Sequence, residues 1–240
     1  LDEADRMLDI GFRPDIERIL RRCPTNRQTL LLSATFNDEI KELTKRYLYE
    51  PVHIDCSSKS MSVETIEQRY ITAETDEKYD LLVELLRREL PPQVIIFCRT
   101  KLGTARLHRK LEESLGADEK LKSMRVETIH GNMTQPQRDR VFARLRKGDI
   151  DVLVATDVVG RGIDVSTISH IINFDLPQDS DDYVHRVGRT GRMGREGIAF
   201  SFVSRDDGIL LTEIEQRINR LLIKDELSLP VRGSKQQSTD

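Results

Sequence analysis

The chain has 240 residues, a length that allows between one and two domains at about 150 residues each. Its 38% hydrophobic and 33% charged residues are typical of a globular protein and exclude collagen-like, low-complexity and wholly disordered chains. The net charge of −3 indicates no basic surface over the whole protein, so any site for nucleic acid must be local.

Membrane and secretory signals are missing from the sequence. No apolar run approaches the roughly 18 residues of a membrane helix, and no apolar leader opens the chain, which predicts no membrane partner. Cys23, Cys56 and Cys98 have neither disulfide-like nor zinc-like spacing, which favours a reducing, cytoplasmic location. The chain begins at Leu1 instead of a methionine, and we therefore expect it to be a piece of a longer protein.

Residues 1–55 contain the patterns of two short strands and two helices. The apolar residues 29–32 predict a buried strand, Asn37 is a suitable cap for the helix that follows, and residues 52–54 predict another strand. These elements are too few for an independent core, so we expect this section to be the end of a preceding domain. The serine-rich segment 56–63 is the predicted linker.

From residue 64 onward, short apolar runs alternate with amphipathic helical patterns. The predicted strands cover residues 66–71, 94–98, 126–129, 152–155, 170–174 and 198–203. Strands that are apolar on both faces and alternate with helices predict a parallel sheet covered on both sides. Residues 64–223 are therefore predicted to form one complete α/β domain, followed by a polar tail over 224–240.

Two segments of this domain carry residue types that suit phosphate chemistry. Between His185 and Arg192, glycines allow the backbone to approach a ligand closely, and Arg189 and Arg192 can direct planar donors at phosphate oxygens. The alternative for this segment is a solvated basic loop. The polar segment from Ala155 to Asp164 follows a predicted strand, and ligands bind outside the carboxyl ends of strands in open α/β sheets.

Two segments of the front section are ambiguous by themselves. Asp2-Glu3-Ala4-Asp5 equally suits an acidic helix start, since helix N-termini favour carboxylates. Ser33-Ala34-Thr35 follows the strand predicted over 29–32, and alone it would be interpreted as a helix cap.

Taken in order, six segments resemble the DEAD-box RNA helicase family: DEAD at 2–5, SAT at 33–35, IIFCRT at 95–100, HGNMTQPQR at 130–138, ATDVVGRGID at 155–164 and HRVGRTGR at 185–192. The resemblance covers nearly the whole chain and implies an α/β fold of RecA-like parallel sheets flanked by helices, as in P-loop NTPase-type helicase cores. It further implies the C-terminal part of lobe 1 over 1–55 and a complete lobe 2 over 64–223.

The resemblance also implies an ATP-dependent RNA helicase that couples ATP hydrolysis to local duplex unwinding or RNP remodelling. ATP and Mg²⁺ are the implied cofactors, and RNA and the rest of lobe 1 in cis are the implied partners. The implied catalytic positions are Asp2, which would hold Mg²⁺ through water, Glu3, which would orient or activate the attacking water, and the arginine fingers Arg189 and Arg192. Asp164 would bind the nucleotide together with Arg189 and Arg192.

The remaining matched positions concern coupling and RNA. The positions implied to couple the ATP state to lobe closure are Asp5, Ser33, Thr35 and His185. Those implied to contact the RNA sugar–phosphate backbone are Thr100, Gly131, Gln135, Arg138 and Thr156. Backbone contacts carry little sequence information, so we expect RNA binding that is nearly sequence-independent and sensitive to salt.

The family's phosphate-binding loop, GxxxxGK[ST], is absent from this sequence, so the chain by itself is expected not to hydrolyse ATP. One alternative is a non-catalytic RNA-binding or partner-binding RecA-like module, although the catalytic-type residues Asp2, Glu3, Arg189 and Arg192 argue against it. A DNA-directed helicase of the same superfamily fits the motifs less well.

Overall fold

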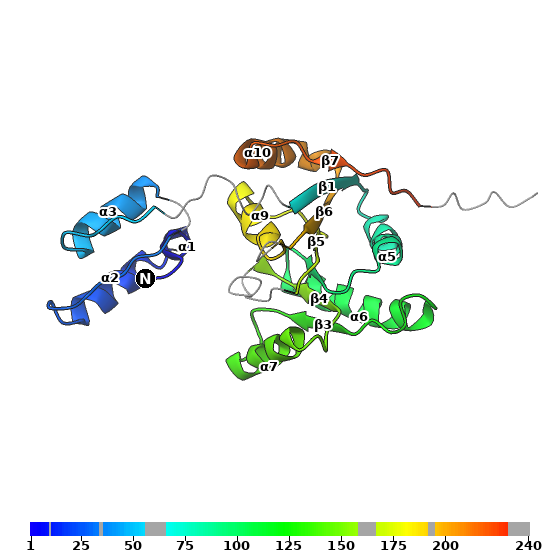
Figure 1. Cartoon of the computed structure of the whole chain (residues 1–240), viewed down its shortest axis with the longest axis horizontal. Coiled ribbons are helices and arrows are strands. Elements are labelled where there is room, and N and C mark those ends of the chain that lie inside the picture. Colours follow the sequence, from blue (N-terminus) through cyan, green and yellow to red (C-terminus); the bar gives the residue numbers. More distant parts are fainter. Residues whose placement is uncertain (10, 34–35, 56–65, 158–166, 192–194, 230–240) are drawn as a thin grey trace, which may run out of the picture. The chain divides into compact units, whose positions relative to one another are not determined.

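The computed structural model describes residues 1–9, 11–33, 36–55, 66–157, 167–191 and 195–229. The chain divides into two compact units, Leu1–Ser57 and Ser58–Asp240, which are considered separately (Figure 1). Within the described ranges, none of the helices has the length and apolar character needed to cross a bilayer.

The first unit is built from short helices around a small apolar core. Its helices are α1 (Ala4–Asp9), α2 (Arg13–Arg22) and α3 (Asp38–Tyr47). Their buried side chains form one cluster of Ala4, Leu8, Ile16, Leu20, Ile40 and Leu43. The expected cap of α3 is confirmed, because the Asn37 side chain accepts a hydrogen bond from the Ile40 amide at 3.0 Å.

The strands predicted over 29–32 and 52–54 are wrong, because neither segment is a strand in the described structure. Leu30 is 66% exposed and Val52 is 86% exposed. A strand needs a neighbouring strand to hydrogen-bond with, and the backbone of 30–32 instead bonds to the first residues of the chain. The Leu32 amide donates to the Leu1 carbonyl at 2.8 Å, and the Leu1 amino group donates to the Leu30 carbonyl at 2.8 Å.

The second unit contains a seven-stranded sheet in the order β3-β4-β2-β5-β6-β1-β7, in which every neighbouring pair is parallel. The strands are β1 (Ile66–Thr72), β2 (Val94–Phe97), β3 (Val126–Ile129), β4 (Val152–Ala155), β5 (His170–Asn173), β6 (Gly197–Val203) and β7 (Ile223–Lys224). The predicted parallel sheet is therefore confirmed, with β7 as an edge strand that the sequence pattern does not predict.

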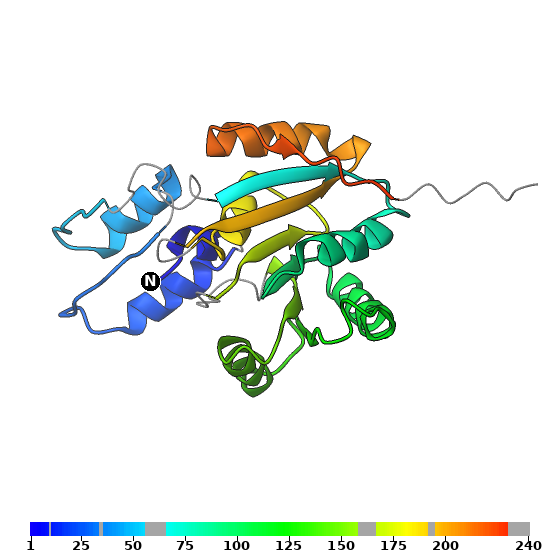
Figure 2. The ribbon, with the colours of Figure 1, turned by 45° about the vertical axis from the view of Figure 1, so that its right-hand side comes forward.

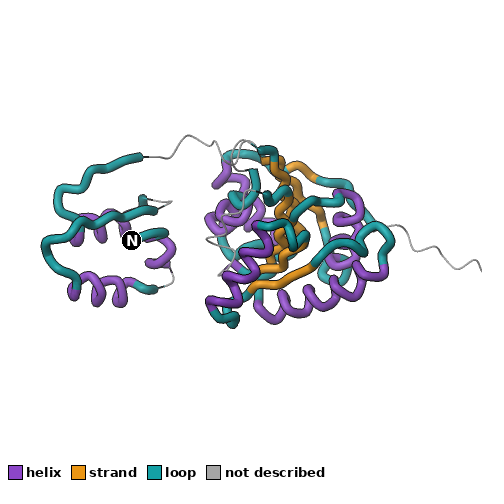
Figure 3. The backbone as a smooth tube through the Cα atoms, turned by 60° about the horizontal axis from the view of Figure 1, so that its bottom comes forward, coloured by secondary structure: helices purple, strands orange, loops and turns teal. Residues whose placement is uncertain are grey.

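Helices cover both faces of this sheet (Figures 2 and 3). They are α5 (Lys78–Glu89), α6 (Lys101–Ala117), α7 (Gln135–Arg146), α9 (Ser180–Val187) and α10 (Gly208–Ile218), with the short 3₁₀ helix η2 (Arg205–Asp207) before α10. Helices α5 and α6 pack on the face that carries Ile96 and Val154. Helices α7, α9 and α10 pack on the face that carries Phe97 and Leu153. Successive residues of one strand thus enter opposite cores, which explains why the central strands are apolar throughout.

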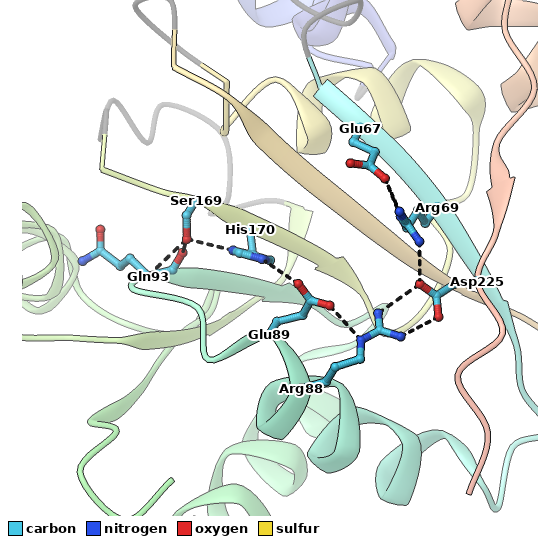
Figure 4. A network of polar contacts seen from close by, with 8 residues as sticks. All are labelled: Glu67, Arg69, Arg88, Glu89, Gln93, Ser169, His170 and Asp225. Atoms are coloured by element: carbon cyan, nitrogen blue, oxygen red, sulfur yellow. Dashed lines mark hydrogen bonds and ion pairs between the residues drawn. The ribbon is translucent and has the colours of Figure 1, made fainter. Parts of the chain in front are cut away.

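The polar tail predicted over 224–240 is wrong for residues 224–229, because these residues pack on the domain. Strand β7 pairs with β1, and the amide of the buried Asp225 donates to the Tyr70 carbonyl at 2.8 Å. The Asp225 carboxylate accepts hydrogen bonds from Arg88 at 2.8 and 3.0 Å and from Arg69 at 3.2 Å (Figure 4). The Leu227 side chain packs against the apolar cluster to which α5 contributes. Two guanidinium groups from distant elements therefore hold a segment that is polar in sequence.

Replacing Asp225 by alanine is expected to lower the free energy of unfolding at pH 7 by roughly 1.5–3 kcal/mol, the range for hydrogen bonds to a charged group. Burial alone would raise the pKa of Asp225, but the hydrogen bonds from Arg88 and from the Leu227 amide outweigh burial and lower it. A carboxyl with a lowered pKa stabilises the fold above its unfolded pKa, and this contribution disappears as pH falls through the folded pKa. The variant should therefore lose less stability than the parent when the pH is lowered below about 4.

Urea unfolding at pH 7 and at pH 3 measures both effects. Glu226→Ala is the matched control. Glu226 is the next residue along the chain, carries the same charge as Asp225 and has an exposed side chain. Equal behaviour of the two variants would contradict the anchoring role of Asp225.

Candidate functional site

Three strands of the sheet end level with one another, and each is followed by a residue matched to RNA contact. Phe97 of β2 and Ile129 of β3 both stand opposite Ala155 of β4. Because the strands are parallel, the residues that follow them lie along one edge of the sheet. Thr156 follows β4 directly, while Thr100 and Gly131 follow the ends of β2 and β3 within three residues. The structure thus brings these three positions to one carboxyl edge.

Thr100 caps the amino end of helix α6 and keeps a hydroxyl hydrogen available for a ligand. Its Oγ1 accepts from the Gly103 amide at 3.0 Å, so the hydroxyl can still donate its own hydrogen. A Cβ on Gly103 would lie 3.1 Å from this Oγ1, so a side chain there would have to displace the Thr100 hydroxyl by a few tenths of an ångström. Thr100 is exposed, and the amino end of α6 favours negative charge. This corner of the edge therefore suits a phosphate.

The loop after β3 and the start of α7 bring together the other matched positions. Arg138 Nη2 donates to the Gly131 carbonyl at 2.8 Å, while its buried Nε has no hydrogen-bond partner among the described residues. Gln135 is exposed, and its Nε2 donates to Asp139 at 2.8 Å. Lys101 Nζ lies 3.5 Å from the side-chain oxygen of Asn132, which connects this loop with α6. Donors from two helices thus surround the end of β3.

Arg186 of α9 is a buried cation that the motif contains but to which sequence reasoning gives no role. Its guanidinium group is 2% exposed and makes a two-pronged pair with Asp157, at 2.5 and 2.8 Å. Its Nη1 donates to the Asn173 side chain at 3.1 Å and to the Asp175 carbonyl at 2.6 Å. The available signal is helical spacing, because residue 186 shares the core-facing side of α9 with Tyr183.

The segment after α9 lies toward the opposite end of the strands. The Thr190 hydroxyl donates to the carbonyl of Ile168, which precedes β5, at 2.7 Å. Arg189 and His185 are both half-buried, and Arg189 Nε donates to the His185 carbonyl at 3.1 Å. The structure therefore does not group Arg189 with Thr100, Gly131 and Thr156. Arg192 and Asp164 lie outside the described residues.

In the first unit, the acidic segment lies beside Ser33. The Asp5 amide donates to the Ser33 hydroxyl at 3.2 Å, and the Ala4 amide donates to the Leu32 carbonyl at 3.0 Å. Asp5 is buried, whereas Asp2 and Glu3 are exposed. Thr35 lies outside the described residues.

Asp2 suits a hydrated magnesium ion better than a closed metal cage. Its exposed carboxylate offers oxygen ligands, and Mg²⁺ commonly binds proteins through one or two carboxylates while it keeps several waters. Across the described ranges, no group of three or more His, Cys, Asp or Glu side chains is placed to hold a metal. An ion at Asp2 would therefore have to take most of its ligands from water and phosphate oxygens.

Two family models match the chain: the DEAD/DEAH box helicase over residues 1–43 and the helicase conserved C-terminal domain over residues 77–194. The DEAD-box ATP-dependent RNA helicase CshA of Bacillus cereus is 43% identical over 230 residues, which are 96% of this chain and 42% of the relative. The chain belongs to the DEAD-box helicase family. It spans about two fifths of the length of the CshA proteins it matches, 42% in this case.

Solved structures of DEAD-box proteins share the fold. One is Dbp5 of Saccharomyces cerevisiae bound to RNA and ADP BeF3, which is 34% identical with a TM-score of 0.81. The match covers 94% of this chain and 58% of the Dbp5 chain. The Escherichia coli DEAD-box protein SrmB, bound to regulator of ribonuclease activity A, is 34% identical over 70% of this chain and 97% of its own, with a TM-score of 0.59. These matches confirm the RecA-like fold class expected for a DEAD-box chain.

Proposed function

We propose that this chain is part of an ATP-dependent RNA helicase that couples ATP hydrolysis to local RNA unwinding or RNP remodelling. We assign residues 1–55 to the C-terminal part of lobe 1, 56–63 to a linker and 64–223, extended by the packed segment 224–229, to lobe 2. One observation carries the proposal: three of the five positions matched to RNA contact follow neighbouring parallel strands that end level.

The carboxyl edge offers the kinds of donors that a phosphate backbone needs. They are the Thr100 hydroxyl, the amino end of α6 and the guanidinium of Arg138, with Gly131, Gln135 and Thr156 beside them. Phosphate and sugar contacts position a nucleic acid without reading its bases. The edge is therefore suited to RNA of any sequence, in keeping with a remodelling enzyme.

The nucleotide roles belong to the other matched residues. Asp2 would hold Mg²⁺, which supplies charge neutralisation at the phosphates when bound, and Glu3 would orient the attacking water. Arg189 and Arg192 would stabilise the charge on the transferred phosphoryl group, and Asp164 would contact the nucleotide. In this scheme the coupling residues are Asp5, Ser33, Thr35 and His185. The Dbp5 relative, solved with RNA and ADP BeF3, supports both ligands.

Replacing Arg138 by glutamine is expected to weaken binding of single-stranded RNA and to reduce the slope of log K against log salt by about one, because one phosphate contact is lost. Fluorescence anisotropy of a labelled oligouridylate at several salt concentrations measures both quantities for the 240-residue chain.

Arg144→Gln is the matched control for this measurement. It removes the same charge from the same helix, where Arg144 pairs with Glu127. Its salt slope should equal that of the parent chain. An equal change of slope in both variants would indicate a general charge effect and would contradict an RNA contact at Arg138.

A further inference from the structure

Asp175 lies at the carboxyl edge, beside the strand ends that carry the candidate RNA contacts. It follows β5, which is the neighbour of β2 on the side away from β4. Its Oδ2 accepts from the Arg99 amide at 2.9 Å, and its Oδ1 lies 3.7 Å from Lys78 Nζ. Its backbone carbonyl accepts from Arg186 Nη1 at 2.6 Å. One residue therefore joins groups from α5, α9 and the end of β2.

The carboxylate contact fixes the backbone immediately before Thr100. Strand β2 ends at Phe97, where the Asp175 amide donates to the Phe97 carbonyl at 3.2 Å. The Arg99 amide then returns a hydrogen bond to the Asp175 side chain, so both sides of this turn are tied to the same residue. Since the Thr100 hydroxyl is aimed by the backbone that precedes α6, this anchor sets where its hydrogen can donate.

The carbonyl contact leads to the second strand end. Arg186 donates hydrogen bonds to the Asp175 carbonyl and to the Asp157 carboxylate, and Asp157 is the residue directly after Thr156. The guanidinium group also lies over the Phe97 ring, with its central carbon 5.0 Å from the ring centroid. The ends of β2, β4 and β5 are thereby connected through one buried cation, which restricts their relative movement.

We propose that Asp175 is a positioning residue for RNA: its carboxylate holds the turn before Thr100, next to the backbone carbonyl through which Arg186 joins this turn to the Thr156 strand end. The proposal rests on the proposed RNA edge. A carboxylate near phosphates is unfavourable by charge alone, and Lys78 offsets that charge. Removing the carboxylate should therefore weaken RNA binding if Asp175 positions the turn, and should strengthen RNA binding if its charge is all that matters.

Asp175→Ala and Asp175→Asn separate the two explanations, because both remove the same charge. Asparagine keeps a side-chain oxygen that can accept from the Arg99 amide, and alanine does not. We expect Asp175→Ala to weaken binding of the oligouridylate by roughly three- to tenfold, the size of one lost hydrogen bond, and Asp175→Asn to restore most of that affinity. The salt slope should stay at the parent value in both, since no phosphate contact is removed.

Asp151→Ala is the matched control at the amino edge of the same sheet. The Asp151 carboxylate, like that of Asp175, accepts a hydrogen bond from the backbone amide of an arginine, here Arg125, and its side chain is 21% exposed, compared with 29% for Asp175. This control should bind RNA as tightly as the parent or more tightly, because it removes a negative charge and the hydrogen bonds it breaks, with Arg125, lie at the amino edge. Circular dichroism confirms that each variant is folded. If Asp175→Ala does not fold, Asp175→Glu serves instead, since it keeps the charge but displaces the carboxylate, and weaker binding is again expected.

The outcomes distinguish the two proposals. Equal affinities of Asp175→Ala and Asp175→Asn, or of Asp175→Ala and Asp151→Ala, would overturn the positioning role while leaving the RNA edge intact. A reduced salt slope in Asp175→Ala would overturn it as well, because it would mean that a phosphate contact had been lost. Absence of RNA binding by the parent chain would overturn the proposed RNA edge, and the positioning role with it.

Discussion

Replacement of Arg186 by glutamine is expected to lower the free energy of unfolding of the second unit by roughly 3 kcal/mol, the lower end of the range for removing one partner of a buried ion pair. The guanidinium group is almost fully buried and donates four hydrogen bonds, to Asp157, Asn173 and the Asp175 carbonyl. Its loss leaves these acceptors without their donor. We choose the lower end because the Asp157 side chain keeps some contact with water, which offsets part of its desolvation.

Urea unfolding followed by circular dichroism measures this loss. Arg125→Gln is the control, because Arg125 makes the same two-pronged contact with Asp151 but from an exposed position at the amino edge. Exposed pairs contribute little to stability, so the unfolding midpoint of this control should stay close to that of the parent. A similar loss of stability in both variants would show that burial of the Arg186 ion pair does not make it more important than an exposed pair.

The sheet of the second unit could be predicted because its strands carry the signal locally. Residues 94–97 and 152–155 are apolar without interruption, and in a parallel sheet buried on both faces this pattern has few alternatives. The strand predicted over 29–32 has the same pattern and fails. A segment forms a strand only beside another strand, and the described part of the first unit contains none for residues 29–32 to pair with. An apolar run therefore predicts a strand only where its partners are also present.

The candidate site also has a part that the sequence could predict and a part that it could not. Thr100, Gly131 and Thr156 could be placed together from the sequence, since the carboxyl ends of parallel strands meet at one edge. The contacts of Arg186 could not, because Asp157 is 29 residues away and the Asp175 carbonyl belongs to the backbone of another element. The anchor of Asp225 is more distant still, at 137 residues from Arg88. Local periodicity holds no information about such pairs.

The largest effect is expected at Arg189 in a longer chain that continues this sequence upstream through a phosphate-binding loop. Arg189→Ala should reduce the rate of RNA-stimulated ATP hydrolysis in such a chain by about 10³-fold or more, the range for an arginine finger. The 240-residue chain itself should show no RNA-stimulated hydrolysis, because it has no such loop. A steady-state assay at saturating RNA measures both rates.

Arg205→Ala is the matched control for this loss, since Arg205 is an exposed arginine of the same unit that pairs with Glu74. It should leave the rate unchanged. Arg189→Ala should retain binding of single-stranded RNA without nucleotide, because Arg189 lies toward the other end of the strands from Thr100 and Thr156. A parent rate in Arg189→Ala would exclude its role at the phosphate. An equal loss of hydrolysis and of RNA binding would instead mean that the substitution damages the fold of the lobe, and would contradict the separation of the two sites.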